Sequence, residues 1–174
     1  MCWWPTIARV VEARVGRTPI DTRFGTYIGA MPTIFTRIID GDIPGTFVWR
    51  DERCVAFMSI NPMAHGHALV VPIEEVDHWV DASPELSAHL FDVTRHIARA
   101  QAEAFRPERV GVIIAGYEVP HTHVHVIPTN DMAELSFANA APSVDRSDLD
   151  AAAHAIRTAL AAAGHGDHVA GLSS

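Results

Sequence analysis

Cysteine is scarce in this sequence, with two residues of 174, Cys2 and Cys54. They lie in unrelated contexts and show no Cys-x-x-Cys spacing, so a disulfide framework is not expected. A chain without such a framework suits a reducing compartment, and we predict a cytoplasmic location.

Long apolar runs are also missing. No stretch approaches the roughly 18 apolar residues that a membrane-spanning helix needs, so we predict no membrane partner. A secretory signal needs an uninterrupted apolar segment of about 7–15 residues. Within residues 1–30, charged side chains interrupt every apolar run: Arg9, Glu12, Arg14 and Arg17. We therefore interpret residues 1–30 as an N-terminal extension, expected to be poorly ordered and separate from the functional unit.

Positive charge is in deficit as well. Thirteen arginine and lysine residues against 21 aspartate and glutamate residues give a formal net charge of −8. This negative net charge argues against a nucleic acid partner. An anionic ligand would need local hydrogen-bond donors. Hydrophobic residues make up 48% and charged residues 20% of the chain, as is typical of a globular domain of ordinary size.

From residue 32 onward the hydrophobic pattern predicts an α+β fold. Apolar residues at helical or alternating spacing predict helices over 33–39, 83–106 and 147–163, and strands over 47–50, 54–58, 66–72, 110–115 and 119–128. Ser83 and Pro84 are typical of the first residues of a helix. The expected architecture is an antiparallel sheet of about five strands with one long helix and short flanking helices. We divide the chain into the extension, a domain over 31–140, and a C-terminal helix and tail over 141–174.

Three histidines alternate with threonine and valine between Val119 and Pro128. Alternation at period two is typical of a β-strand, which would place His121, His123 and His125 on one face, about 7 Å apart. Imidazole is both a metal ligand and an acid–base group near neutral pH. The stretch therefore indicates either a metal site or a catalytic face.

The run His121-Thr-His123-Val-His125-Val-Ile resembles the His-x-His-x-His-x-x signature of the histidine triad (HIT) superfamily. The resemblance covers roughly residues 32–130, because further segments fall in the order and spacing seen there: Ile34-Phe35 through Ile38-Ile39, Ile43-Pro44, Asp51-Glu52-Arg53, Ala56-Phe57, Asn61-Pro62 and the run from Gly66 to Pro72. It is closest to small single-domain members with nucleoside phosphoramidase or nucleotide hydrolase activity. The resemblance implies a homodimer, which pairs through the long helix and a sheet edge, and no metal or other cofactor in catalysis.

The resemblance also implies the chemistry. A phosphoramidate or dinucleoside polyphosphate would be cleaved through a covalent nucleotidyl-histidine, with His123 attacking the α-phosphorus as a neutral imidazole. The other ring nitrogen of His123 must be held as a donor, and a strand carbonyl near His121 would do this. His125 would contact the phosphate and help to protonate the leaving group. His121, backed by His67, would orient the nucleophile.

The substrate implied is a small nucleotide, a purine nucleoside monophosphate derivative. Its base would lie among apolar side chains, whose alternative role is core packing: Ile34, Phe35, Ile38, Ile43 and Phe57. Ser59 stands where family members commonly carry an aspartate that holds both ribose hydroxyls, so we predict weaker ribose recognition. Backbone N–H groups around Tyr117, Glu118 and Val119 would bind phosphate, with the Glu118 carboxylate pointing away because like charges repel.

Two other functions stay open. The first is a Zn²⁺-binding protein that uses His121, His123 and His125 with His67 as a fourth ligand, since converging imidazoles would bind Zn²⁺ at least adventitiously. No acidic residue lies within the motif to assist a metal-bound water, which argues against metalloenzyme chemistry. The second is a non-catalytic, nucleotide-binding regulatory dimer.

Overall fold

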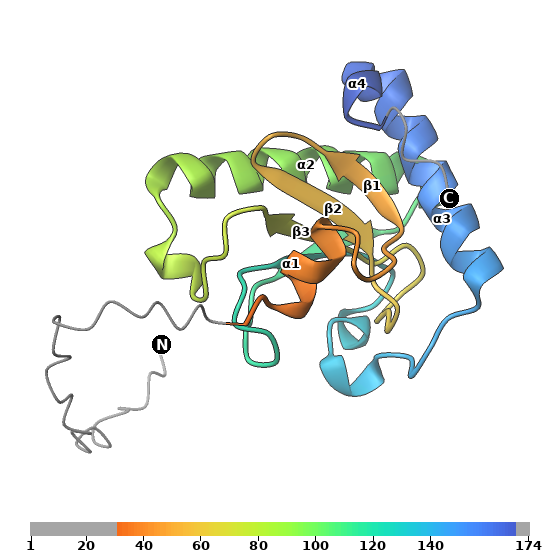
Figure 1. The fold of residues 1–174 in the computed structure, drawn as a ribbon. Helices are drawn as coiled ribbons and strands as arrows, with labels where there is room; N and C mark the ends of the chain where they lie inside the picture. The colour runs from red at the N-terminus through yellow and green to blue at the C-terminus, as the bar shows by residue number, and fades with distance from the viewer. Residues whose placement is uncertain (1–30, 170–174) are drawn as a thin grey trace, which may run out of the picture. The chain divides into compact units, whose positions relative to one another are not determined.

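The computed structural model describes residues 31–169 (Figure 1). The predicted extension, residues 1–30, lies outside the described residues, as do residues 170–174. The strands are β1 Phe47–Arg50, β2 Cys54–Met58, β3 Ala68–Pro72, β4 Arg109–Ile113 and β5 Val124–Thr129. The helices are α1 Ile34–Ile39, α2 Pro84–Phe105, α3 Arg146–Leu160 and α4 Gly166–Val169, with shorter helical turns at Trp79–Asp81, Met132–Glu134, Phe137–Asn139 and Ala161–His165.

The five strands form one sheet in the order β1-β2-β3-β5-β4, and every neighbouring pair is antiparallel. The α+β fold with a five-stranded antiparallel sheet and one long helix is thereby confirmed. β4 lies at one edge of the sheet, where its residue Val112 is exposed. No helix within residues 31–169 combines the length and the hydropathy needed to cross a bilayer.

Local signals set the bounds of the long helix. The Ser83 hydroxyl accepts a hydrogen bond from the Leu86 N–H at 3.1 Å, and Pro84 occupies the first turn, where a missing N–H costs nothing. At the other end Arg106 adopts a left-handed conformation, φ 52°, which stops the helix. The predicted helix over 83–106 therefore matches α2 closely.

Both faces of the sheet are buried. On one face Cys54, Ala56 and Met58 of β2 pack in a core with residues of α2 and α3. On the other face Val55 and Phe57 pack with α1. Figure 1 shows α1 and α2 on opposite sides of the sheet. Because strand residues alternate between faces, burial on both sides explains why β2 is apolar throughout.

The histidine stretch differs from the predicted continuous strand. β5 begins only at Val124, so His121 and His123 precede it. Pro120 has no N–H to donate, and the Thr122 N–H bonds to the Val76 carbonyl at 2.6 Å instead of joining the ladder. The expectation that three histidines lie on one strand is therefore wrong, and only His125 belongs to the sheet.

Candidate active site

His123 is held in a single orientation by the backbone next to it. Its Nδ1 lies 2.8 Å from the His121 carbonyl oxygen, which can only accept, so Nδ1 carries the proton. The remaining nitrogen, Nε2, keeps its lone pair. The Phe35 ring packs edge-on against the imidazole, with centroids 4.9 Å apart. The ring is therefore both oriented and fixed in one tautomer.

His125 and His67 form a directly bonded pair. The Met63 N–H donates to His67 Nδ1 at 3.2 Å, so the proton of a neutral His67 is on Nε2. That Nε2–H donates to His125 Nδ1 at 3.0 Å, and the proton of His125 is consequently on Nε2. The sequence predicts that His67 supports His121; the structure places it against His125 instead. The pair gives His125 a defined N–H donor.

His121 lies behind the other histidines and is completely buried. Its Nε2 donates to the Pro72 carbonyl at 2.8 Å, and its Nδ1 accepts from the Thr33 hydroxyl at 2.9 Å. Glu75 extends this network, because its carboxylate accepts from the Thr33 N–H at 3.1 Å and from the Thr36 hydroxyl at 2.8 Å. With both nitrogens engaged, His121 positions the backbone carbonyl that holds His123.

Burial lowers the pKa of each of the four histidines. For His67 the value falls to about 4, through burial and then the nearby His123 ring. For His125 it falls to about 3, through burial and then the rings of His67 and His123. For His123 burial dominates, although the His121 carbonyl and the Glu118 charge act in the opposite direction. All four rings are therefore neutral at pH 7, which preserves the lone pair on His123.

The histidines face a cavity of about 610 Å³. Three of them line it, His67, His123 and His125, whereas His121 lies outside its wall. The apolar residues predicted for the base pocket all line it too: Ile34, Phe35, Ile38, Ile43 and Phe57. Its volume is in the range of ordinary small-molecule sites. One compartment thus combines an apolar wall with two free imidazole nitrogens.

Of the remaining predicted binding residues, three line the cavity and one does not. Ser59, Glu118 and Val119 line the cavity, but Tyr117 does not, and 96% of its surface is exposed. Glu118 is predicted to turn away from the phosphate, whereas the structure places it in the cavity wall, near enough for its charge to affect the pKa of His123.

A second group of cavity residues comes from the segment after β5: Phe137, Ala140, Ala141, Pro142 and Arg146. This segment is tied to the turn after β2, because Asn61 Nδ2 donates to the Pro142 carbonyl at 2.6 Å and the Ala141 N–H donates to the Pro62 carbonyl at 2.9 Å. The Phe137 ring contacts His125 edge-on at 5.1 Å. The residues before α3 show no clear periodicity, so the sequence offered no signal for this wall.

The ring nitrogens of the four histidines do not point to one centre. His121 is bonded to Thr33 and Pro72, and the facing nitrogens of His67 and His125 bond to each other. Only Nε2 of His123 and Nε2 of His125 remain for a ligand. The zinc site proposed as an alternative would require His67 and His121 to give up these hydrogen bonds.

Thr33 allows a test of this network. Its hydroxyl caps α1 by accepting from the Thr36 N–H at 3.2 Å and donates to His121. We expect Thr33→Val to lower the free energy of unfolding by about 1–2 kcal/mol, as measured by urea denaturation, because it removes a cap and leaves a buried acceptor unpaired. Thr33→Ser keeps the hydroxyl and should lose far less. A loss in Thr33→Ser as large as that in Thr33→Val would contradict this assignment, because serine keeps the hydroxyl.

Comparison with known proteins places the histidines within a shared domain. A profile of the HIT domain matches residues 40–132, a range that contains all four histidines of the site. The protein named Protein hit from Bacillus subtilis is 36% identical over 100 residues, which cover 55% of this chain and 69% of that relative. An uncharacterized HIT-like protein of Mycobacterium tuberculosis is 30% identical over 136 residues, 75% of this chain and 94% of the relative. An adenylylsulfatase of Arabidopsis thaliana is 26% identical over 103 residues, which cover 56% of this chain and 52% of that relative.

Solved structures extend the likeness to the fold. A Zn-bound histidine triad family protein from Mycobacterium smegmatis aligns with a TM-score of 0.68 at 29% identity, over 78% of this chain and 98% of that one. A Hit-like protein from Bartonella henselae, solved with an unknown ligand, aligns with a TM-score of 0.65 at 30% identity, over 73% and 95%. The profile match ends before Phe137 and Arg146, so that part of the cavity wall lies outside the residues that the HIT profile matches.

Proposed function

The chain belongs to the HIT family, and on this premise we propose that it cleaves a nucleoside 5′-phosphate derivative through a covalent nucleotidyl-His123 intermediate. One observation carries the proposal. The Nδ1–H of His123 donates to the His121 carbonyl at 2.8 Å, which leaves Nε2 as an unprotonated nucleophile at the cavity. A histidine held in this way needs no proton removed before it attacks.

The two half-reactions use the described groups. His123 Nε2 attacks the α-phosphorus, the phosphorus–nitrogen bond to His123 forms, and the bond to the leaving group breaks. The His125 Nε2–H donates a hydrogen bond to the leaving atom as negative charge develops on it. The departed group takes up a proton from solvent. Water then attacks the phosphorus and releases a proton to solvent, the bond to His123 breaks with its electron pair returning to Nε2, and the nucleoside monophosphate is released. The relative named adenylylsulfatase supports a hydrolase of this type.

The cavity suits a purine nucleoside monophosphate derivative as substrate. Phe35 and Phe57, whose rings lie 5.7 Å apart, give the apolar wall flat surfaces for a base. Ser59 offers the ribose one hydroxyl where a carboxylate would offer two charge-assisted acceptors, so we expect weak discrimination between ribose and deoxyribose. We also propose a cytoplasmic homodimer, for which the exposed edge strand β4 and the neighbouring α2 would supply the interface.

The test is intact mass spectrometry of enzyme incubated briefly with an adenosine phosphoramidate and a chelator, then quenched in denaturant at neutral to alkaline pH, because acid hydrolyses a phosphorus–nitrogen bond to histidine. We expect an added mass of one adenylyl group, which peptide mapping locates at His123. Turnover that disappears with the chelator, with no adduct, would favour the zinc-binding alternative. Nucleotide binding with neither turnover nor adduct would favour the regulatory dimer.

A further inference from the structure

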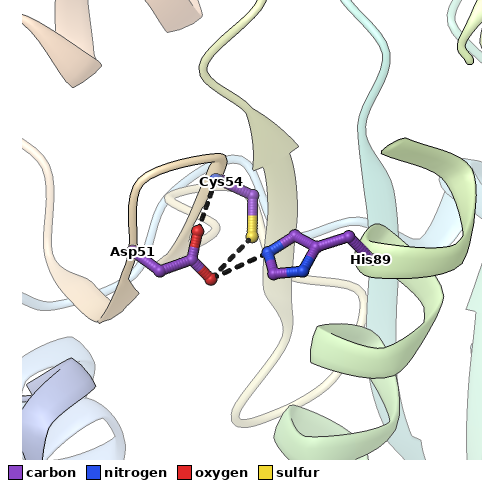
Figure 2. Close-up of side chains that lie close together, drawn as sticks. All are labelled: Asp51, Cys54 and His89. Carbon is purple, nitrogen blue, oxygen red and sulfur yellow. Dashed lines mark hydrogen bonds and ion pairs between the residues drawn. The ribbon is translucent and has the colours of Figure 1, made fainter. Parts of the chain in front are cut away.

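A second cluster of ligand-type side chains lies at the start of the long helix. Asp51 follows β1, Cys54 begins β2, and His89 projects from α2, so three segments meet there (Figure 2). The His89 Nε2 lies 2.9 Å from Asp51 Oδ2, and the Cys54 Sγ lies 3.6 Å from the same oxygen. One nitrogen, one oxygen and one sulfur all lie within 4.8 Å of one another.

These separations are close to those of a metal centre. Zn²⁺ binds His nitrogen and carboxylate oxygen at about 2.0–2.2 Å and Cys sulfur at about 2.3 Å, with tetrahedral geometry. Such bond lengths place the ligand atoms roughly 3.3–3.5 Å apart. The two separations given above, 2.9 and 3.6 Å, lie on either side of this range. For these two pairs, side-chain shifts of a few tenths of an ångström would give ligand spacing, and the third pair, His89 nitrogen and Cys54 sulfur, lies within 4.8 Å.

The backbone holds the Asp51 carboxylate through the oxygen that does not face the other two ligands. Its Oδ1 accepts from the backbone N–H groups of Arg53 and Cys54, both at 2.8 Å. Its Oδ2 accepts from the Trp49 indole at 2.8 Å and faces the thiol and the His89 ring. A cation could take the place of the donors on Oδ2 while the bonds to Oδ1 preserve the turn.

The hydrogen bonds and the burial of the cluster suit a divalent cation better than a nucleophilic cysteine. Asp51 accepts hydrogen bonds from the Trp49 indole and from the backbone N–H groups of Arg53 and Cys54, the pattern expected of an ionised carboxylate. The Cys54 side chain is completely buried, so solvent and a bulky electrophile do not reach its sulfur. A divalent cation would neutralise one carboxylate and one thiolate, leaving no net charge in this half-buried place.

A cavity beside the cluster gives a cation access to it. Asp51 and His89 line a cavity of about 740 Å³ that also holds more metal-ligating side chains: Asp92, His96, His165, Asp167 and His168. The side chains of His89 and Asp51 are 28% and 11% exposed, whereas Cys54 lies behind them. A cation can therefore enter from the cavity, and its fourth coordination position would face that cavity.

We propose that Asp51, Cys54 and His89 form a site for a divalent transition metal, with Zn²⁺ as the best match to a sulfur, nitrogen and oxygen donor set. Binding replaces the thiol S–H bond by a metal–sulfur bond and releases that proton to solvent. The ring proton of His89 moves to Nδ1, which frees Nε2 for the metal. The bound ion would fasten the β1–β2 turn to α2, and it would be separate from the nucleotide cavity.

The test is a Co²⁺ titration of the full chain followed by absorption spectroscopy, with Zn²⁺ added afterwards as a competitor. We expect a thiolate-to-cobalt charge-transfer band together with the visible bands of tetrahedral cobalt, and we expect Zn²⁺ to abolish both. Cys54→Ser should remove the charge-transfer band. His89→Gln, a change on a partly exposed helix position, should weaken binding at least about 10–100-fold, because even outer-shell changes have effects of that size.

Two matched variants serve as controls. Cys2→Ser removes the other cysteine of the chain, and His154→Gln removes an exposed histidine of α3. Both should titrate like the wild type, and nucleotide turnover should be unchanged in all four variants. The proposal is overturned if the wild type shows no charge-transfer band, if the band persists in Cys54→Ser, if it disappears in Cys2→Ser, or if the folded His89→Gln protein binds as tightly as the wild type.

Discussion

Turnover of an adenosine phosphoramidate is expected to fall at least about 10⁴-fold in His123→Ala, because the variant lacks the atom that bonds to phosphorus. The KM should change little, since the apolar wall around Phe35 and Phe57 remains to bind the nucleoside. The loss should therefore be in kcat, and the adenylyl adduct should be absent. Steady-state kinetics and intact mass measured on the same preparations check both points.

His65→Ala is the matched control for this variant. His65 is exposed, packs on Phe105 with ring centroids 5.0 Å apart, and does not line the cavity. We expect its kinetics to equal those of the wild type. A His123→Ala enzyme that kept a tenth of the wild-type kcat, or that formed the adduct on another histidine, would contradict the assignment of the nucleophile.

The parts of the fold that were predictable depend on local patterns. The start of α2 follows from Ser83 and Pro84, and its end follows from Pro107, because a proline disfavours the helical conformation in the residue before it. The short strands follow from alternation and turn residues, and the order of the apolar segments agreed with the HIT resemblance. The residues that the HIT resemblance suggested for a base pocket all line one cavity, and their role in binding a base stays a prediction.

The parts that were missed depend on contacts between distant segments. Alternation predicts a strand through His121 and His123, but strand formation needs a partner, and Thr122 bonds to Val76 outside the ladder. The partner of His67 follows from the register of β3 on β5, which pairs Leu69 with His125. The hydrophobic periodicity of a single segment does not determine that register. The Asp51, Cys54 and His89 cluster was missed for the same reason, since its members come from separate segments.

The two tautomers at the cavity have different consequences for catalysis. His123 presents a lone pair, fixed by the His121 carbonyl, and His125 presents an N–H, fixed by His67 and the Met63 N–H. A histidine pair without these bonds could exchange roles by shifting protons. In the proposed mechanism these hydrogen bonds would give His123 the role of nucleophile and His125 the role of donor before substrate binds, and each role can be tested separately.

The donor role predicts that His125→Ala lowers kcat/KM by about 10²–10³-fold for a substrate with a poor leaving group, the usual effect of removing one preorganised donor. With a good leaving group, such as a nitrophenolate, the loss should be much smaller, because little charge needs stabilising on the departing atom. Comparing two adenylyl substrates that differ only in leaving group, in wild type and variant, measures this difference. The good substrate should still form the adduct at His123, since the nucleophile is intact. Equal losses for both substrates would place the His125 N–H on the phosphate oxygens instead of on the leaving atom.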